Sequence, residues 1–336
     1  MSLSRRSFLV ILSCVPIAAA SRPVGGKHQR VQSVYDAPTI TNYNARDNAL
    51  LVEGRTLLIA LTFAVPVMEL TARLPVPLNP EWAGGPRLTE PQELFFYPGK
   101  DGRTFHTILS APLDSVAGTH TLHVTARTAD RGAQQWTFPY TIQHGNYRHT
   151  SVSLDEGFSS PSPEVAAQMR EDFETVVELF QRRTARQWRE GFMRPVAGAD
   201  KDNFGVKRTV NQTKQYRHNG LDFKAGVGTP VRAINDGIVA FSGEQWTPGQ
   251  TVCIDHGGSI LSKYNHLSER RVRVGDRVSR GQIIALSGRS GGQKPAPHLH
   301  LNLIINRTPV DPKDFMQTAA RLISLEAVGV TTRGAA

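Results

Sequence analysis

The chain is poor in cysteine, which excludes a fold held together by disulfides. Its 336 residues contain two cysteines, Cys14 and Cys253. If the amino-terminal segment is removed after Ala20, Cys253 is left alone and no intramolecular disulfide can form. Cys253 lies in the strand-like run 251–255, where we expect a buried and inert thiol rather than a nucleophile.

Several catalytic and binding signatures are also missing. No His-Glu-x-x-His occurs, and Ser290 lacks the spacing of a nucleophile elbow. The glycines of 287–292 are not followed by Gly-Lys-Ser/Thr, which excludes a phosphate-binding loop.

The net charge of the chain is +10, which suits binding to nucleic acid, an anionic membrane or a cell-wall polymer, but also a simply solvated basic surface. No zinc-finger spacing and no basic helix with interleaved aromatics occur, so we expect no nucleic-acid partner.

The amino terminus carries the features of an export signal. Arg5 and Arg6 precede the apolar run 8–20, which ends in small residues and is too short for a comfortable membrane span. Residues 1–20 are therefore predicted to be a cleaved signal peptide, leaving no stable membrane span. Residues 4–9 also resemble a twin-arginine signal. A weaker lipoprotein-like site leaves lipidation at Cys14 as the alternative to cleavage.

The front half of the chain has the pattern of short strands. Residues 21–45 are rich in Gly, Ser, Asn and Arg and predict a flexible lead. Residues 46–150 then predict an immunoglobulin-like β-sandwich, because turn signals separate short apolar runs. The expected strands are 57–63, 69–74, 93–97, 105–109, 119–127 and 135–142. The histidines of this half lack metal-ligand spacing and are expected to be surface or structural residues; they are His106, His120, His123, His144 and His149.

A helical linker is predicted at 151–190. Ser162 can cap a helix whose first residue is Pro163, and Glu164 suits its positive end. The apolar residues that follow have helical spacing and are expected to pack against a domain; they are Val165, Met169, Phe173, Val176 and Phe180.

Residues 191–318 predict a second β-rich domain. Residues 319–336 predict a tail, with a weak helix and a loose end. Helical periodicity is almost absent between 200 and 310. The expected strands are 229–241, 251–255, 260–264, 282–286 and 298–305. The fold class is therefore all-β, with an antiparallel sheet in this part. Because the two halves have separate strand sets, a fragment of about 190–316 is expected to fold alone.

Five residues of this second half carry the functional signal: His218, Asp222, His266, His298 and His300. Two His and one Asp suffice to bind a catalytic zinc whose fourth position is left to water. The remaining two His can then transfer protons beside the metal.

The spacing of these residues supports convergence on one point. In an extended segment His298 and His300 face the same side, while the alternating leucines 299, 301 and 303 face the core. Gly220, between His218 and Asp222, favours a bent segment over a helix.

These motifs resemble the lysostaphin/LytM-type zinc metallopeptidases over about residues 192–316. The shared motifs occur in the family's order at 218–223, 228–239, 252–257, 264–268, 274–283 and 297–300. The resemblance implies a duplicated hybrid motif-like sheet, one Zn²⁺ per chain held by His218, Asp222 and His300, and catalytic assistance from His266 and His298. Two departures stand out: the usual aromatic–acidic pair is Leu301-Asn302, and the usual small residue before the central histidine is Asn265.

The resemblance implies a secreted zinc metalloendopeptidase, a hydrolase of peptide crosslinks in bacterial peptidoglycan. Its partners would be the peptide stems or crosslinks of the cell wall, and its location the periplasm or cell envelope. The alternative is a non-catalytic peptidoglycan-binding or amidase-activating module, as in some relatives of this family. Loss of zinc ligands normally marks that state, and here every ligand is kept.

Overall fold

The computed structural model describes residues 38–42, 50–75, 91–129, 132–153, 161–212, 214–292 and 296–328. The predicted signal peptide 1–20, the possible lipidation site Cys14 and most of the predicted lead 21–45 lie outside the described residues. The described part is mostly β-strand, with two helices, which confirms the predominantly β character. No helix in these ranges combines the length and apolar character needed to cross a membrane.

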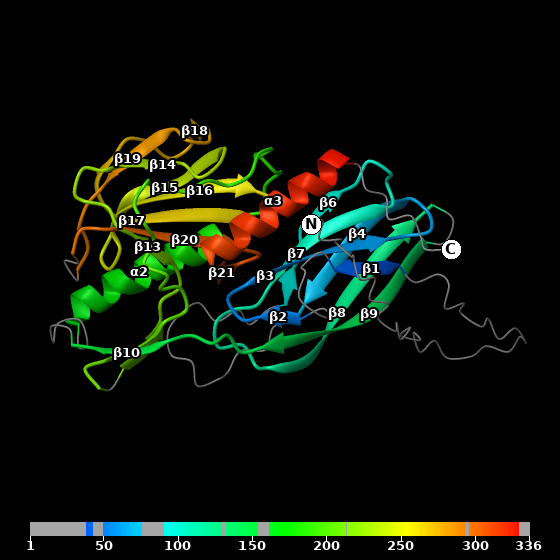
Figure 1. The fold of residues 1–336 in the computed structure, drawn as a ribbon, viewed down its shortest axis with the longest axis horizontal. Helices are drawn as coiled ribbons and strands as arrows, with labels where there is room; N and C mark the ends of the chain where they lie inside the picture. The colour runs from blue at the N-terminus through cyan, green and yellow to red at the C-terminus, as the bar shows by residue number, and fades with distance from the viewer. Residues whose placement is uncertain are drawn as a thin grey trace, which may run out of the picture.

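Two sheets of the front half share one apolar core (Figure 1). The first has the order β1 (Thr39–Asn42), β3 (Thr56–Thr62), β7 (Thr104–Ser110), β6 (Phe96–Pro98). The second has the order β2 (Leu50–Val52), β9 (Gly132–Gln143), β8 (Gly118–Thr128), β4 (Val67–Leu74), β5 (Gln92–Glu93). Strand β1 lies within the predicted lead 21–45, so that lead ends earlier than the composition suggested. The immunoglobulin-like class of this half stays a prediction.

Alternation along single strands explains how this core forms. In β8, Leu122 and Val124 are buried whereas His123 between them is exposed. Leu122 lies opposite Phe138 of the antiparallel partner β9, and both enter the same core. The period of two predicted these strands because it is the period at which side chains change face.

Helix α2 (Pro163–Phe180) begins as expected, with the hydroxyl of Ser162 accepting from the backbone N–H of Val165 at 3.4 Å. Its last turn buries Leu179 and Phe180 against the sheet of the second half. Phe173, in the middle of the predicted apolar stripe, is 41% exposed. The stripe is therefore covered at its carboxyl end but not along its whole length.

The second half is built on a nine-stranded antiparallel sheet. Its main order is β13 (Leu221–Phe223), β20 (Leu299–Ile305), β17 (Ile260–Arg270), β16 (Gly249–Gly257), β15 (Gly237–Gln245), β18 (Arg277–Val278). Strands β14 (Pro230–Arg232) and β19 (Ile283–Ser287) pair with each other, β19 also pairs with β17, and β21 (Thr308–Val310) pairs with β20. The single strand expected at 229–241 is two strands, β14 and β15, separated by a bend at 234–236.

A third, small sheet joins the segment that follows the front half to the segment that precedes His218. Strand β10 (His149–Val152) pairs in parallel with β11 (Lys207–Val210), which pairs with β12 (Lys214–Arg217). Strand β10, which follows the front half, therefore pairs with the hairpin β11–β12, which ends immediately before His218.

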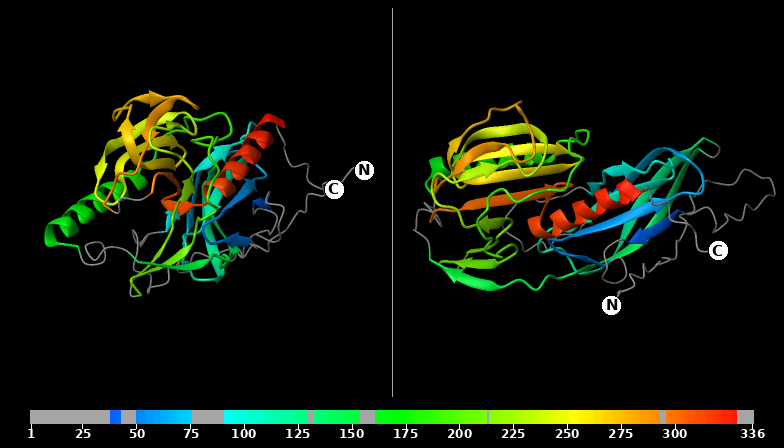
Figure 2. Two further views of the ribbon diagram at one scale, coloured as in Figure 1. Left: turned by 60° about the vertical axis from the view of Figure 1, so that its left-hand side comes forward. Right: turned by 45° about the horizontal axis from the view of Figure 1, so that its top comes forward.

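Helix α3 (Pro312–Val328) lies between the two halves (Figures 1 and 2). Its Phe315 and Leu322 are fully buried in a core that also includes Leu58 of the front half. Asp314 accepts hydrogen bonds from the backbone N–H and hydroxyl of Thr56, at 2.8 and 2.7 Å. The helix continues to Val328, within the segment 319–336 for which the sequence indicates a weak helix and a loose tail.

This shared core also changes the expectation for a fragment of about 190–316. Such a fragment would lack Leu322 together with Leu58, Tyr97 and Ile108, which belong to the same apolar cluster. It would expose the surface that these side chains cover. We now expect it to be poorly soluble or molten, in contrast to the full chain.

We predict that Leu322→Ala destabilises the protein by about 2–5 kcal/mol, because it removes a fully buried side chain and leaves a cavity. Gln317→Ala, on the exposed face of the same helix, is the matched control and should change stability by less than about 0.5 kcal/mol. Urea denaturation of the full chain measures both. Equal stabilities would mean that α3 is not part of the core.

Candidate metal centre

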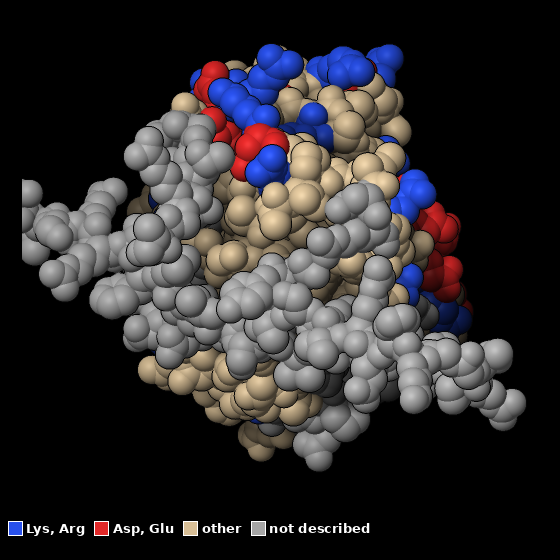
Figure 3. Space-filling model, turned by 90° about the vertical axis from the view of Figure 1, so that its right-hand side faces the viewer, with Lys and Arg blue, Asp and Glu red and all other residues tan. Residues whose placement is uncertain are grey.

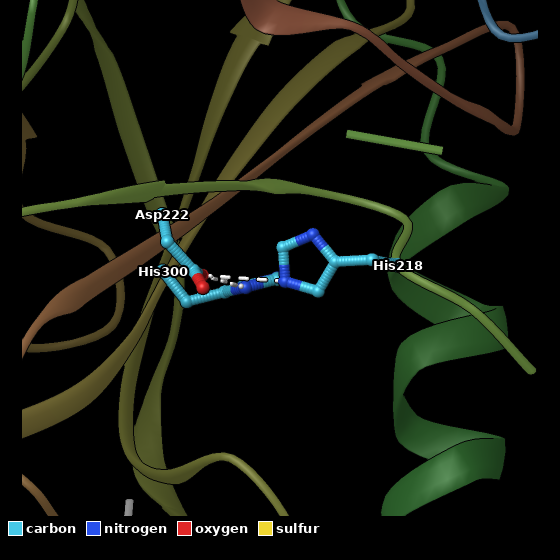
Figure 4. Close-up of side chains that lie close together, drawn as sticks. All are labelled: His218, Asp222 and His300. Carbon is cyan, nitrogen blue, oxygen red and sulfur yellow. Dashed lines mark hydrogen bonds and ion pairs between the residues drawn. The ribbon is translucent and has the colours of Figure 1, made fainter. Parts of the chain in front are cut away.

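Three side chains that could bind a metal converge at the edge of the nine-stranded sheet. Their potential ligand atoms, from His218, Asp222 and His300, all lie within 4.8 Å of one another. His218 Nε2 lies 3.3 Å from Asp222 Oδ1, and His300 Nδ1 lies 2.9 Å from the same oxygen. Figure 4 shows His218 approaching from one side, and Asp222 and His300 from the other. All three residues are at least 90% buried.

Strand pairing places two of these residues together. Asp222 in β13 lies directly opposite His300 in β20, so both side chains are on the same face of the sheet. Leu299, Leu301 and Leu303 alternate with that face and are fully buried in the core. The extended conformation expected for this histidine segment is confirmed over Leu299–Ile305.

Gly220 permits the segment that bears His218 to approach His300. A Cβ atom on Gly220 would lie 2.4 Å from His300 Nε2 and 2.6 Å from the carbonyl oxygen of Leu301. Those distances are too short for any side chain, so the segment between His218 and Asp222 reaches the histidine only with glycine there.

Asn203 supports the site, and the sequence analysis missed it. Its backbone carbonyl accepts from His218 Nδ1 at 2.9 Å, and its amide nitrogen donates to Asp222 Oδ2 at 2.8 Å. Its side-chain oxygen also accepts the backbone N–H of Asp222 at 3.1 Å. Because Asn203 binds the far atoms of both side chains, it leaves His218 Nε2 and Asp222 Oδ1 directed at each other. It precedes His218 by fifteen positions, and no local pattern signals the contact.

His266 and His298 lie beside the cluster, with ring centroids 4.8 Å apart. Each donates its Nδ1 proton to a backbone carbonyl: His266 to Ser290 at 2.9 Å and His298 to Ala296 at 2.7 Å. The Nε2 atoms therefore retain lone pairs. His266 has φ = 59°, a left-handed conformation that is rare outside glycine and is concentrated at functional sites.

The electrostatics favour an ionised Asp222 beside neutral His266 and His300 rings. Burial would raise the pKa of Asp222, but hydrogen bonds from His218 and His300 hold the pKa of this carboxyl well below its usual range. Burial lowers the pKa of His300 to about 4, although Asp222 opposes this shift. Burial and then the neighbouring His300 lower the pKa of His266 to about 4. At neutral pH these two rings are free to bind a metal or accept a proton.

The donor set suits zinc. Catalytic zinc sites commonly use three protein ligands, His nitrogens and a carboxylate, and leave one position open. In a tetrahedral site with bonds of about 2.0–2.1 Å, ligand atoms lie roughly 3.3 Å apart. The separations of 3.3 and 2.9 Å at Asp222 Oδ1 are close to that value. Among the described residues no other group of His, Cys, Asp or Glu has this geometry.

The histidines of the front half do not join this group. His123, His144 and His149 are exposed, whereas His106 is buried. On the face drawn in Figure 3, Lys and Arg side chains gather at the top and along the right margin, with Asp and Glu among them.

The front half nevertheless contacts the segment that carries His218. Arg217 donates to Asp114 Oδ1 at 2.8 and 2.5 Å, and its guanidinium lies 3.8 Å from the buried carboxylate of Glu53. Arg217 immediately precedes His218 and its side chain is 14% exposed. The sandwich therefore supplies a mostly buried, charge-assisted anchor for the backbone next to the site.

We predict that Asp114→Ala lowers stability by about 1.5–3 kcal/mol, because it leaves a mostly buried guanidinium short of its partner. Amide hydrogen exchange should become faster at His218, whose N–H is bonded to Val206 O. Glu269→Ala, which breaks an exposed ion pair with Arg271, is the control and should change neither quantity. Unchanged exchange at His218 in Asp114→Ala would contradict the anchoring role.

Residues 216–312 match the model of peptidase family M23, and all five functional candidates lie within this range. This part of the chain is an M23 peptidase domain, as the resemblance in its motifs indicated. The family model thus covers the sheet that bears the metal centre.

Curated relatives agree with this assignment. Over 110 residues the chain is 42% identical to peptidoglycan DD-endopeptidase ShyA of Vibrio cholerae, covering 32% of this chain and 25% of that protein. It is 44% identical over 110 residues to glycyl-glycine endopeptidase ALE-1 of Staphylococcus capitis, covering 30% of each chain. The matches span less than a third of either relative.

A solved structure is similar over a longer stretch. The crystal structure of a Pseudomonas aeruginosa protein assigned to peptidase M23 aligns with a TM-score of 0.57 at 22% identity. The alignment covers 80% of this chain and 95% of that one. The fold of most of this chain, beyond the M23 domain alone, therefore occurs in another protein.

Proposed function

We propose that this protein is a zinc metalloendopeptidase that hydrolyses peptide crosslinks of bacterial peptidoglycan. The observation that carries the proposal is the convergence of His218, Asp222 and His300 on one point, with His266 and His298 beside it. We assign the first three as ligands of one Zn²⁺ and the other two as catalytic residues. Both compared relatives are named as endopeptidases of this general kind.

The arrangement of hydrogen bonds supports a division of labour. Asn203 orients His218 and Asp222 so that one nitrogen and one oxygen face the proposed metal position. A bound zinc would polarise the scissile carbonyl and lower the pKa of its water toward about 7. His266 and His298, whose Nδ1 atoms donate to backbone carbonyls, can take a proton from that water at Nε2 or, once protonated, stabilise negative charge on the carbonyl oxygen.

The bond that is cut is not decided by the relatives, since one is a DD-endopeptidase and the other a glycyl-glycine endopeptidase. We favour a D-alanyl–diaminopimelate crosslink, because the sequence contains no evident wall-targeting repeat or glycine-bridge binding module. Incubation with purified peptidoglycan, with and without a chelator, followed by mass spectrometry, identifies the bond. Intact peptidoglycan in both samples would favour the alternative, a non-catalytic cell-wall module.

Two further proposals concern the rest of the chain. The predicted signal peptide implies export to the periplasm or cell envelope, by the general or the twin-arginine route. The front half is proposed to be immunoglobulin-like and to support the M23 domain structurally. Mass spectrometry of the mature amino terminus distinguishes cleavage after Ala20 from lipidation at Cys14.

We predict that His300→Ala abolishes tight zinc binding, because two remaining ligands rarely hold zinc against water. The double variant His218→Ala/His300→Ala should contain no stoichiometric zinc after purification. Elemental analysis of the dialysed protein measures this, and His256→Ala serves as a control because that buried histidine bonds Asp236 and Ser262 away from the cluster. Stoichiometric zinc in the double variant would refute the ligand assignment.

We predict that His266→Ala and His298→Ala retain zinc and lose activity by on the order of 10²-fold or more, as expected for a positioned acid, base or oxyanion group. Zinc content and the rate of crosslink hydrolysis are measured on the same samples. If either variant loses zinc while His300→Ala keeps it, the roles of these histidines are exchanged.

A further inference from the structure

Two asparagines noted in the sequence analysis as departures from the resembled motifs, Asn265 and Asn302, contact each other. Asn265 Nδ2 donates to Asn302 Oδ1 at 3.1 Å, and both residues are more than 90% buried. Asn265 lies opposite His300 across β17 and β20, and Asn302 follows His300 by two residues on the same face. The departures are therefore one structural unit next to the metal centre.

The hydrogen bonds continue from this pair to the segment that carries His218. Asn302 Nδ2 donates to the backbone carbonyl of Asn219 at 3.0 Å and to its side-chain oxygen at 2.9 Å. Asn219 lies between His218 and Gly220 and is exposed. A buried pair of amides thus holds one exposed amide at the edge of the site.

The carbonyl of Asn219 determines the orientation of every amide in this unit. A carbonyl oxygen only accepts, so Asn302 must present its NH₂ group to it. The side-chain oxygen of Asn302 then faces inward and accepts from Asn265. The second N–H of the Asn302 NH₂ group requires an acceptor, which is the side-chain oxygen of Asn219. The NH₂ group of Asn219 is consequently turned away from the pair, and among the described residues it donates to no protein atom.

We propose that the Asn219 NH₂ group binds an acceptor oxygen of the substrate, which makes Asn219 a specificity-determining residue and Asn302 its positioning residue. This inference rests on the proposed function. Asn219 directly follows the candidate ligand His218, and Asn302, which holds Asn219, is two residues along β20 from His300. The acceptor would therefore be a carbonyl or carboxylate oxygen of the peptide close to the candidate metal centre.

The discriminating variant is Asn219→Asp. It keeps an oxygen facing Asn302 but replaces the outward donor by a negatively charged acceptor. Asn219→Ala removes the donor without adding charge, and Asn302→Asp removes the donor that orients Asn219. Gln135→Glu, the same amide-to-carboxylate change on an exposed position of β9, is the matched control.

Binding is measured by calorimetry on the chelator-treated full chain, using a soluble crosslinked stem-peptide dimer with free carboxylates and the same dimer with its carboxylates amidated. We expect Asn219→Asp to weaken binding of the free-acid peptide by about tenfold or more, because a charge-assisted hydrogen bond becomes a repulsion. Asn219→Ala and Asn302→Asp should weaken it less, and Gln135→Glu not at all. A loss confined to the free-acid peptide identifies a carboxylate acceptor, and an equal loss for both peptides identifies a carbonyl.

Kinetics on the zinc-loaded protein separate this inference from the proposed function. In Asn219→Asp and Asn302→Asp we expect KM to rise with kcat and zinc content unchanged, which a merely structural defect would not produce. A wild-type chain that binds peptide but never hydrolyses it contradicts the proposed function and leaves the inference standing. A wild type that binds neither peptide, or Asn219 variants that bind both as the wild type does, overturns the inference.

Discussion

The pairing of β13 with β20 is the contact on which the candidate metal centre depends. Strand β13 has three residues, and its register places Asp222 opposite His300. A shift by one residue would turn Asp222 to the other face of the sheet. Leu221 and Phe223, the neighbours of Asp222 in β13, oppose such a shift because they would leave the core. Hydrophobic packing on one face therefore maintains the polar geometry on the other.

The rest of the site depends on segments that are distant in the sequence. Asn203 orients His218 and Asp222, the Ser290 carbonyl orients His266, and Asp114 of the front half binds the arginine before His218. In the three histidine and aspartate side chains, the hydrogen bond holds the atom that faces away from the candidate metal position, and this orients the atom that faces it. The front half is thus connected to the metal centre through Arg217 and through the core around α3, so the two halves are less independent than their separate sheets suggest.

Local patterns predicted the strands and the five clustered residues, because alternation and ligand spacing are properties of short segments. The same reasoning failed where the deciding contact is tertiary. Helix α3 was predicted only as a weak helix because its contacts with Leu58 and Thr56 of the front half, which hold it in the core, have no local signal. Asn203 was missed for the same reason, since one asparagine fifteen residues before a histidine has no distinguishing pattern. The strand over 229–241 was predicted as continuous, whereas the structure divides it into β14 and β15 with a bend at 234–236.

The two asparagines noted in the sequence as departures from the family's motifs contact each other in the structure. In the sequence, Asn265 and Asn302 are separated by 37 positions. In the structure they form one hydrogen-bonded unit, in which Asn265 also accepts from Thr251 and Asn302 also donates to Asn219. Loss of the bond between them would leave a buried polar group short of a partner, which costs about 1–3 kcal/mol. The pair therefore belongs to the architecture of this particular site, and its effect reaches the surface through Asn219.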